Sequence, residues 1–296
     1  MAIPESQLDA WSHQGSITQS CATYAAVKRS LEASDTKYAD KSYDIFLQGS
    51  YGNDTNIYAE SDVDVVIRLD SVYYYDTSAL TPAELAAFNS AFSPGTYPYA
   101  TYKADVVAAL QRSFGAADVI PEKNAVKIKA SGNRRSADVL VACEYRRYLS
   151  GYSYLKYEQG VCFFDSAGNQ IVNYPKQHST NCTRKHQATN QWFKPMVRVL
   201  KNMRTSLVES AAIQAGSAPS YFLEGLLYNV PANKFGSSYG DTFVATFNWI
   251  LSAKRDNLLC ANEQYYLVRD SVTNCWPSAN FDKFVTQAIQ LWNNWS

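Results

Sequence analysis

The pattern of apolar and polar residues changes character about halfway along the chain. In the first half, short apolar runs predict strands at 45–47, 63–69, 125–130 and 137–142. Alternation within the longer runs supports this, because successive side chains of a strand point to opposite faces. In the second half, apolar residues recur every three or four positions, as they do along one side of an α-helix. The chain is therefore predicted to join a part built of strands and helices to a mostly helical part.

Helices are also expected between the strands of the first half. After a short helical start around Leu8 and Trp11, a long helix is predicted to end near residues 34–35. Its stripe consists of Ile17, Cys21, Tyr24, Lys28 and Leu31. A capping box over Thr81–Glu84, with Pro82 at the first helical position, predicts a helix that runs to about Phe92. A further helix is predicted over 102–114, and a hairpin over 154–173 with its turn at 165–169.

From Gln187 onward the helical pattern is continuous. One stripe consists of Trp192, Met196, Val199/Leu200, Met203 and Leu207, and Lys201 lies off it. A second helix is predicted over 220–229 with Ser220 as its N-cap, a third over 242–253 and a last one over 281–295. Residues 1–180 are therefore predicted to form one lobe that includes the N-terminal helix, and residues 181–296 to form a helical lobe.

Two aspartates open the second predicted strand. Asp62 and Asp64 alternate with Val63 and Val65, so the carboxylates lie on one face of the strand and the valines on the other. Two carboxylates so close repel each other unless a cation lies between them. Hard oxygen ligands that act together with substrate phosphates are typical of Mg²⁺ sites. Taken alone, the pair is better explained as a solvated strand end.

A Gly-Ser pair and a third aspartate extend this pattern. Ser50 of Gly49-Ser50 precedes Asp62 by twelve residues, and the pair offers N–H groups and a hydroxyl to phosphate oxygens. Asp138 lies at the entrance of an apolar strand, where a buried charge needs a partner or a cation. Neither Gly-Ser nor Asp-x-Asp is specific by itself. Their order and spacing together favour a catalytic site over a simple turn and a solvated strand end.

Gly-Ser followed by Asp-x-Asp and a third aspartate resembles the signature of polymerase-β-like nucleotidyltransferases. The whole chain resembles one branch of them, the cGAS/DncV-like nucleotidyltransferases (CD-NTases) of bacterial anti-phage CBASS operons. The resemblance rests on Gly49-Ser50-Tyr51, Asp62-Val63-Asp64, Ala137-Asp138-Val139, Asn173-Tyr174-Pro175, Arg198-Val199-Leu200-Lys201 and Pro219-Ser220-Tyr221. It implies an α+β fold in which a mixed-sheet nucleotidyltransferase lobe packs on a helical lobe. The active site is expected in the cleft between them.

The resemblance implies a role for each site residue. Asp62, Asp64 and Asp138 would be catalytic and would hold two Mg²⁺ ions, for which Mn²⁺ could substitute. The nucleotide-binding residues would be Gly49, Ser50, Lys201, Ser220 and Tyr221. Lys201 and Ser220 would contact the triphosphate, and Tyr221 would stack on a base. The alternatives are a solvated helix face for Lys201 and core packing for Tyr221.

The implied activity joins nucleoside triphosphates, including a purine nucleotide, into a cyclic di- or trinucleotide. This second messenger would act in anti-phage defence through a downstream effector that senses it. Ring closure is implied by the family alone. Two alternatives remain open: a nucleotidyltransferase that modifies a small molecule such as an aminoglycoside, a protein or an RNA end, and an inactive family member that only binds nucleotide.

Composition narrows the class of partner. The 296 residues are 46% hydrophobic, which is enough for a sizeable core, and their formal net charge is zero. Zero net charge argues against a broad basic surface, so we expect no obligatory nucleic-acid partner. The sequence has no run of eighteen apolar residues and no signal-peptide pattern at its start. We therefore expect a soluble, cytoplasmic monomer that does not bind membranes.

The cysteines suggest one further possibility, a zinc site. The six cysteines are scattered without a CxxC, so we expect them to be reduced and mostly buried. Cys162, His178, Cys182 and His186 would be the zinc ligands, but they span a hairpin and an expected loop. No CxxC or HxxxH pair anchors them, so we expect hydrogen-bonded histidines instead.

Overall fold

The computed structural model describes residues 1–15, 17–58, 62–151 and 155–295. The chain forms two compact units that do not follow a single cut along the sequence. The sheet unit comprises residues 17–48 and 61–175, and the helical unit comprises residues 1–16, 49–60 and 176–296. The main part of the helical unit begins at residue 176. It also takes in two segments from the first part of the chain.

The sheet unit is built on one mixed sheet. In the described part of the chain, seven strands pair in the order β1-β2-β5-β4-β3, with β6 on β5 and β7 on β6. The strands are β1 (Tyr43–Leu47), β2 (Val63–Asp76), β3 (Val119–Pro121), β4 (Val126–Ile128), β5 (Ala137–Tyr148), β6 (Tyr157–Phe164) and β7 (Gln170–Asn173). The central pair β2–β5 is parallel, and the other pairs are antiparallel. The α+β class with a mixed sheet is confirmed.

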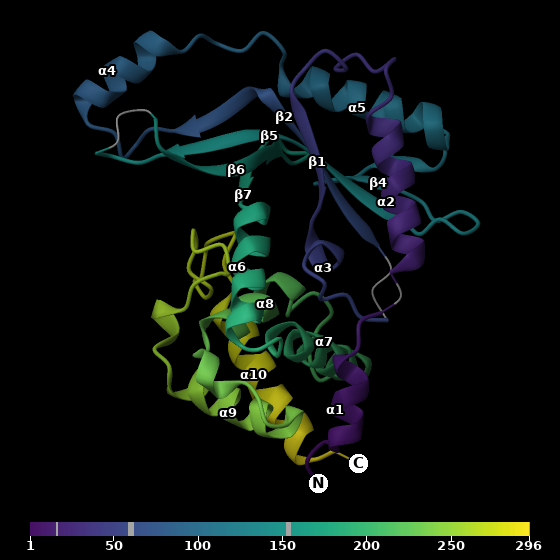
Figure 1. Ribbon diagram of the computed structural model, residues 1–296, viewed down its shortest axis with the longest axis vertical. Helices are drawn as coiled ribbons and strands as arrows, with labels where there is room; N and C mark the ends of the chain where they lie inside the picture. The colour runs from purple at the N-terminus through teal and green to yellow at the C-terminus, as the bar shows by residue number, and fades with distance from the viewer. Residues whose placement is uncertain (16, 59–61, 152–154, 296) are drawn as a thin grey trace. The chain divides into compact units, whose positions relative to one another are not determined.

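Three helices belong to the sheet unit: α2 (Thr18–Leu31), α4 (Pro82–Ala91) and α5 (Tyr99–Phe114). Helices α2 and α5 pack on each other and cover one face of the sheet (Figure 1). The predicted capping box at α4 is present, with the Thr81 hydroxyl and the Glu84 carboxylate each bonded to the other residue's backbone N–H. Phe88 of α4 packs against Tyr75 of β2 and Tyr148 of β5.

The two central strands are longer than the sequence predicts. Pairing of β2 with β5 shifts register after Leu69 and resumes at Tyr73. The prolonged strands carry polar residues that satisfy each other, which the apolar pattern cannot reveal. The Arg146 guanidinium lies 3.8 Å from the centre of the Tyr73 ring and 4.8 Å from that of Tyr157, a favourable cation–π arrangement. The expected hairpin is present as β6 and β7, although residue 154 lies outside the described residues.

The buried side of α2 differs from the predicted stripe. Ile17 and Cys21 are exposed, whereas Ser20, Thr23 and Val27 are buried. Small polar residues therefore face the interior. The buried positions of α2 lie one residue away from most of the positions in the predicted apolar stripe. The other five cysteines are buried and all six are free thiols, as expected.

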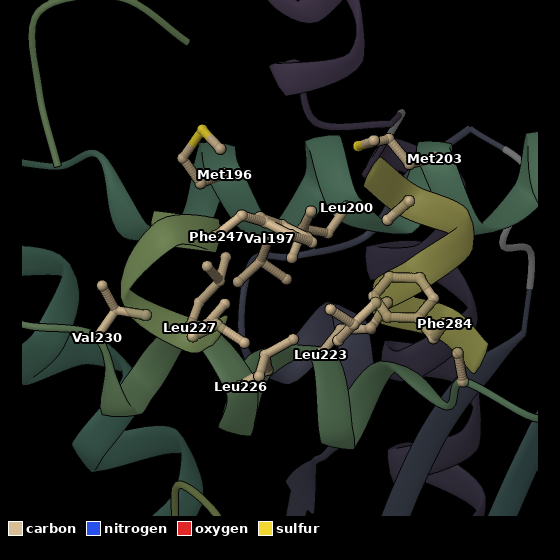
Figure 2. Close-up of a cluster of buried hydrophobic side chains, with 14 of the residues drawn as sticks. Met196, Val197, Leu200, Met203, Leu223, Leu226, Leu227, Val230, Phe247 and Phe284 are labelled. Atoms are coloured by element: carbon tan, nitrogen blue, oxygen red, sulfur yellow. The ribbon is translucent and has the colours of Figure 1, made fainter. Parts of the chain in front are cut away.

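The helical unit contains α1 (Glu5–Ser12), α3 (Gly49–Gly52), α6 (Pro175–Ala188), α7 (Phe193–Glu209), α8 (Ser220–Asn229), α9 (Tyr239–Ser252), α10 (Ser278–Asn293) and the 3₁₀ turns η1 (Ala232–Lys234) and η2 (Arg255–Asn257). The predicted stripe of α7 forms its core. Met196, Leu200 and Met203 pack with Leu223 of α8 and Phe284 of α10 (Figure 2). Within the described ranges, no helix combines the length and apolar character that a membrane crossing needs.

Two local predictions for this unit are wrong. Residues 175–188, expected to include a loop, form α6, whose buried positions are His178 and Cys182. The buried positions of α6 are occupied by these residues rather than by aliphatic ones, so a pattern of apolar residues does not predict this helix. Ser220 is not an N-cap: Pro219 occupies that position, and the Ser220 hydroxyl accepts a hydrogen bond from Arg204.

Candidate active site

Asp64 and Asp138 are neighbours on the central parallel strands. They are register partners in the β2–β5 pair, directly after Val63 and Ala137. Register partners on adjacent strands project to the same face, so the two carboxylates lie side by side on the sheet. Val63 and Ala137 are fully buried on the opposite face. Asp62 lies two residues before Asp64, immediately before β2 begins.

Two residues that the sequence patterns did not single out contact these carboxylates. Lys127 of β4 is the register partner of Asp138, and its Nζ lies 3.8 Å from Asp62 Oδ2. The Ser136 hydroxyl donates a hydrogen bond to Asp62 Oδ1. The signal for Lys127 was available, because it alternates with the two apolar residues of β4. Together these contacts place Asp62 on the same face as the other two aspartates.

The carboxyl group of Asp138 has the character of a metal ligand. Its Oδ1 is buried and has no hydrogen-bond partner among the described residues. Burial raises the pKa of Asp138; the charge on Lys127 lowers it, and the charges on Asp62 and Glu122 raise it further. A buried carboxylate oxygen without a donor is costly unless a cation meets it. Three carboxylates on one face fit a hard divalent cation such as Mg²⁺ or Mn²⁺.

Gly49 and Ser50 open the segment that follows β1 and belongs to the helical unit. Gly49 has a φ of 62°, in the left-handed region that glycine adopts without steric cost. Gly49 is the first residue of α3, a single helical turn. The Gly49 and Ser50 carbonyls accept hydrogen bonds from the N–H groups of Asn53, at 3.1 Å, and Thr55, at 2.9 Å. Backbone hydrogen bonds within residues 49–55 thus stabilise the predicted turn at Gly49-Ser50.

Lys201 is not on a solvated helix face. Its side chain on α7 is fully buried, and its Nζ donates a 2.7 Å hydrogen bond to the Thr55 carbonyl. The alternative of a solvated lysine is therefore wrong. Lys201 is held against the segment that begins with the Gly-Ser pair.

Tyr221 lies at the edge of the helical core and is partly buried. Its ring stacks on His178 of α6 with centroids 4.9 Å apart and planes 22° apart. The Tyr221 hydroxyl accepts a 2.9 Å hydrogen bond from Asn262 Nδ2, and burial raises its pKa well above the usual value. One face of the ring is therefore occupied by protein. This is the packing that the sequence allowed as the alternative to base stacking.

The four residues considered for zinc do not form one site. Cys162 lies in the sheet unit, and His186 Nδ1 accepts a hydrogen bond from the Lys194 backbone N–H at 3.3 Å. His178 Nε2 instead lies 2.5 Å from the buried carboxylate of Glu224 on α8. Each histidine thus makes a hydrogen bond through one ring nitrogen, whereas His178 Nδ1 is buried and has no hydrogen-bond partner among the described residues. Glu224 was missed, although a charge inside the apolar run LEGLL was the available signal.

The predicted site residues thus fall into two groups. The sheet unit carries the carboxylates of Asp62, Asp64 and Asp138 on one face of its sheet. The helical unit carries the predicted nucleotide-binding residues, namely Gly49, Ser50, Lys201, Ser220 and Tyr221. The first group has the chemistry of a metal-binding catalytic centre, and the second offers N–H, hydroxyl, ammonium and aromatic groups to a nucleotide.

Comparison with known proteins identifies the family to which the chain belongs. Residues 180–293 match the family model of the cGAS/DncV-like nucleotidyltransferase C-terminal helical domain. The chain is similar to the cyclic UMP-AMP synthase of Rhodothermus marinus, with 38% identity over 100% of this chain and 99% of that protein. It is also similar to the cyclic nucleotide synthase CdnE01 of Staphylococcus haemolyticus, with 35% identity over 100% of both chains.

The fold is shared as well. The solved structure of the Rhodothermus marinus CdnE c-UMP-AMP synthase with Apcpp and Upnpp superposes with a TM-score of 0.90 at 37% identity, covering 99% of this chain and 98% of that one. The Elizabethkingia meningoseptica CdnE cyclic dinucleotide synthase with GTP and Apcpp gives a TM-score of 0.77 at 27% identity, covering 98% of both.

Proposed function

Because the chain belongs to the cGAS/DncV-like nucleotidyltransferase family, we propose that it joins nucleoside triphosphates into a cyclic di- or trinucleotide, with a purine among its substrates. The observation that carries this is the Asp64–Asp138 pair on adjacent strands, with an unpartnered buried oxygen on Asp138. The similar synthases supply the product class, since their names specify cyclic nucleotides. In this proposal the product acts in anti-phage defence through a downstream effector, and the enzyme is a cytoplasmic monomer.

The carboxylates would hold two divalent cations, Mg²⁺ or Mn²⁺. When bound, such ions neutralise charge that develops at the α-phosphorus and on the leaving pyrophosphate. Asp62 and Asp64 supply ligand oxygens from one strand edge. Asp138, as a ligand of one cation, would help to take the proton of the attacking ribose hydroxyl. Lys127, 3.8 Å from Asp62, offsets part of the negative charge of this group.

The helical unit would bind the substrate. Gly49 N–H and the Ser50 hydroxyl bind the β- and γ-phosphates, and Ser220 contacts the triphosphate. Lys201, which is fully buried on the Thr55 carbonyl, supports the segment that begins with Gly49 and Ser50. The exposed part of the Tyr221 ring stacks on a nucleobase. These assignments combine the groups that each residue offers with the resemblance of its segment to the family.

The test is a thin-layer assay of radiolabelled nucleoside triphosphates with Mg²⁺ or Mn²⁺, run with and without alkaline phosphatase. A cyclic product keeps its label after phosphatase treatment because it has no terminal phosphate. A phosphatase-sensitive product would indicate a linear oligonucleotide. Label transferred only to an added small molecule, protein or RNA would favour a different acceptor, and no transfer at all would favour an inactive nucleotide-binding protein.

Activity should not require nucleic acid. The formal net charge of the chain is zero, and binding to a duplex draws most of its affinity from many Lys and Arg contacts to phosphates. Purified protein treated with nuclease should therefore form product at the same rate as protein supplied with double-stranded DNA or RNA. The initial rate in the thin-layer assay measures this. A rate that rises tenfold or more with added duplex would contradict the prediction.

Tyr221 should set nucleotide affinity more than base specificity. Stacking on an aromatic side chain is worth roughly 1–3 kcal/mol per base and tolerates any base. Tyr221→Ala should therefore weaken nucleotide binding about tenfold or more, whereas Tyr221→Phe should bind almost normally. The phenylalanine variant keeps the ring on His178 and loses the hydrogen bonds of the hydroxyl with Asn262 and Cys260. Isothermal titration with ATP, GTP, CTP and UTP analogues checks this, and unchanged affinity in Tyr221→Ala would place the base elsewhere.

A further inference from the structure

A buried carboxylate in the helical unit has no part in the chemistry described above. Glu224 on α8 is 2% exposed and lies between buried leucines. A charge in such a place is tolerated only when donors surround it. Burial alone would raise the pKa of Glu224, but the bond to His178 and the charges of His178 and Lys201 outweigh it and lower the pKa. Glu224 is therefore an acceptor-only carboxylate at neutral pH.

Three side chains donate to this carboxylate. The Thr55 hydroxyl lies 2.5 Å from Oε1, Asn53 Nδ2 lies 3.0 Å from Oε2 and His178 Nε2 lies 2.5 Å from Oε2. Two of the three donors belong to the segment that starts with the Gly-Ser pair. Hydrogen bonds to an ionised group are worth about twice as much as neutral ones. Glu224 is thus a strong anchor for residues 53–55.

The anchored residues in turn hold the Gly-Ser turn. The Asn53 backbone N–H bonds to the Gly49 carbonyl, and the Thr55 N–H bonds to the Ser50 carbonyl. Each of the two residues therefore uses its side chain for Glu224 and its N–H for one residue of the pair. The Glu224 carboxylate is therefore linked to Gly49 through two hydrogen bonds of Asn53, and to Ser50 through two hydrogen bonds of Thr55. Any rotation of the Glu224 carboxylate would be passed directly to the backbone of Gly49 and Ser50.

Basic side chains of α7 also bind residues 53–55, mostly through backbone carbonyl groups. Lys201 Nζ donates to the Thr55 carbonyl at 2.7 Å, and Arg198 Nη1 donates to the Asp54 carbonyl at 2.7 Å. Lys194 Nζ lies 2.8 Å from the Asp54 carboxylate. Opposite charges on α7 and α8 thus hold the side chains of residues 53–55 and the carbonyls of Asp54 and Thr55. Hydrogen bonds from both sides favour a single arrangement of this segment, although His178 Nδ1 is buried without a partner among the described residues.

We propose that Glu224 is a positioning residue, which sets the Gly49-Ser50 turn for the triphosphate through Asn53 and Thr55. The inference rests on the proposed function, in which that turn binds the β- and γ-phosphates. It assigns the group of His178, Cys182 and Glu224, whose ligand atoms lie within 4.8 Å of one another, to hydrogen bonding rather than to a metal. The carboxylate oxygens already face two N–H groups and one O–H group, so a cation would have to displace donors from both.

The test uses Thr55, where a single hydroxyl can be removed without changing shape. Thr55→Val is isosteric and keeps the backbone bonds to Ser50 and Lys201, and Thr55→Ser restores the hydroxyl. Ile250→Val, a core change in α9 of the same unit, serves as the stability control. Isothermal titration with α,β-methylene-ATP and with AMP, in Mg²⁺, separates binding of the triphosphate from binding of the nucleoside. Turnover of wild type and variants is measured in parallel.

Thr55→Val should weaken binding of α,β-methylene-ATP about tenfold, with AMP binding unchanged. Thr55→Ser and Ile250→Val should bind both ligands as wild type does. Wild-type affinity in Thr55→Val, or an equal loss for both ligands, would overturn the proposal. So would a stoichiometric metal ion in the purified protein that is lost in Cys182→Ser. Wild-type protein that makes no product from nucleoside triphosphates would refute the proposed function instead, which keeps the two failures apart.

Discussion

Protein in which Asp62 and Asp64 are both replaced by asparagine should lose nucleotide transfer by about 10³-fold or more. The change removes two ligand charges from the edge of β2 and leaves the volume of both side chains nearly the same. Without them, divalent cations would lose two of the three proposed carboxylate ligands and could not neutralise the charge on the transferring phosphate. The radiolabel assay with Mg²⁺, and again with Mn²⁺, measures the loss.

The fold should survive this substitution. Asp62 is 43% exposed and keeps a hydrogen-bond acceptor for Ser136 as asparagine. Removing negative charges beside Asp138 also relieves repulsion in the metal-free protein, so the melting temperature should stay level or rise slightly. The matched control is Asp35→Asn, an exposed carboxylate of the same unit that pairs with Arg112. Activity of the double variant near that of the control would disprove the metal assignment.

The carboxylate group was predictable because its geometry is local. Alternation along one strand puts Asp62 and Asp64 on one face, and an apolar run after Asp138 marks a second strand. The sequence does not state that the two strands are adjacent and in register, and the structure shows this by pairing Asp64 with Asp138. Strand lengths were underestimated where polar residues such as Arg146 prolong the pairing.

The helical unit was less predictable, because its polar residues are satisfied over long distances in the chain. Lys201 looks like a surface residue until Thr55, 146 positions earlier, supplies its acceptor. Glu224 is compatible with a buried helix only through donors from residues 53–55 and from α6. The apolar periodicity of a sequence does not reveal such distant partners, because it predicts whether a residue is buried from the polarity of that residue alone. Helix α6 was missed for the same reason.

Asp138→Asn should lower turnover by about 10² to 10⁴-fold, the usual range for loss of a general base. Asparagine cannot take the proton of the ribose hydroxyl, and it offers a metal one neutral oxygen in place of a carboxylate. Affinity for α,β-methylene-ATP should change much less than turnover. The comparison of kcat with the dissociation constant checks this, with Asp35→Asn again as the control. Wild-type turnover in Asp138→Asn would assign the base to another group.

The same residue gives a pH signature in metal-free protein. The pKa of Asp138 is raised in the folded state, chiefly by burial, so the folded protein holds this proton more tightly than the unfolded chain does. Its contribution to stability therefore falls as pH rises from the ordinary aspartate pKa to the raised one. Melting temperatures in EDTA between about pH 4 and pH 7 should show this decline in wild type and a weaker one in Asp138→Asn.

Adding Mg²⁺ above that range should raise the melting temperature of wild type more than that of the variant, because a ligand that binds only the folded state stabilises it. Equal gains in both proteins would mean that Asp138 does not bind the metal.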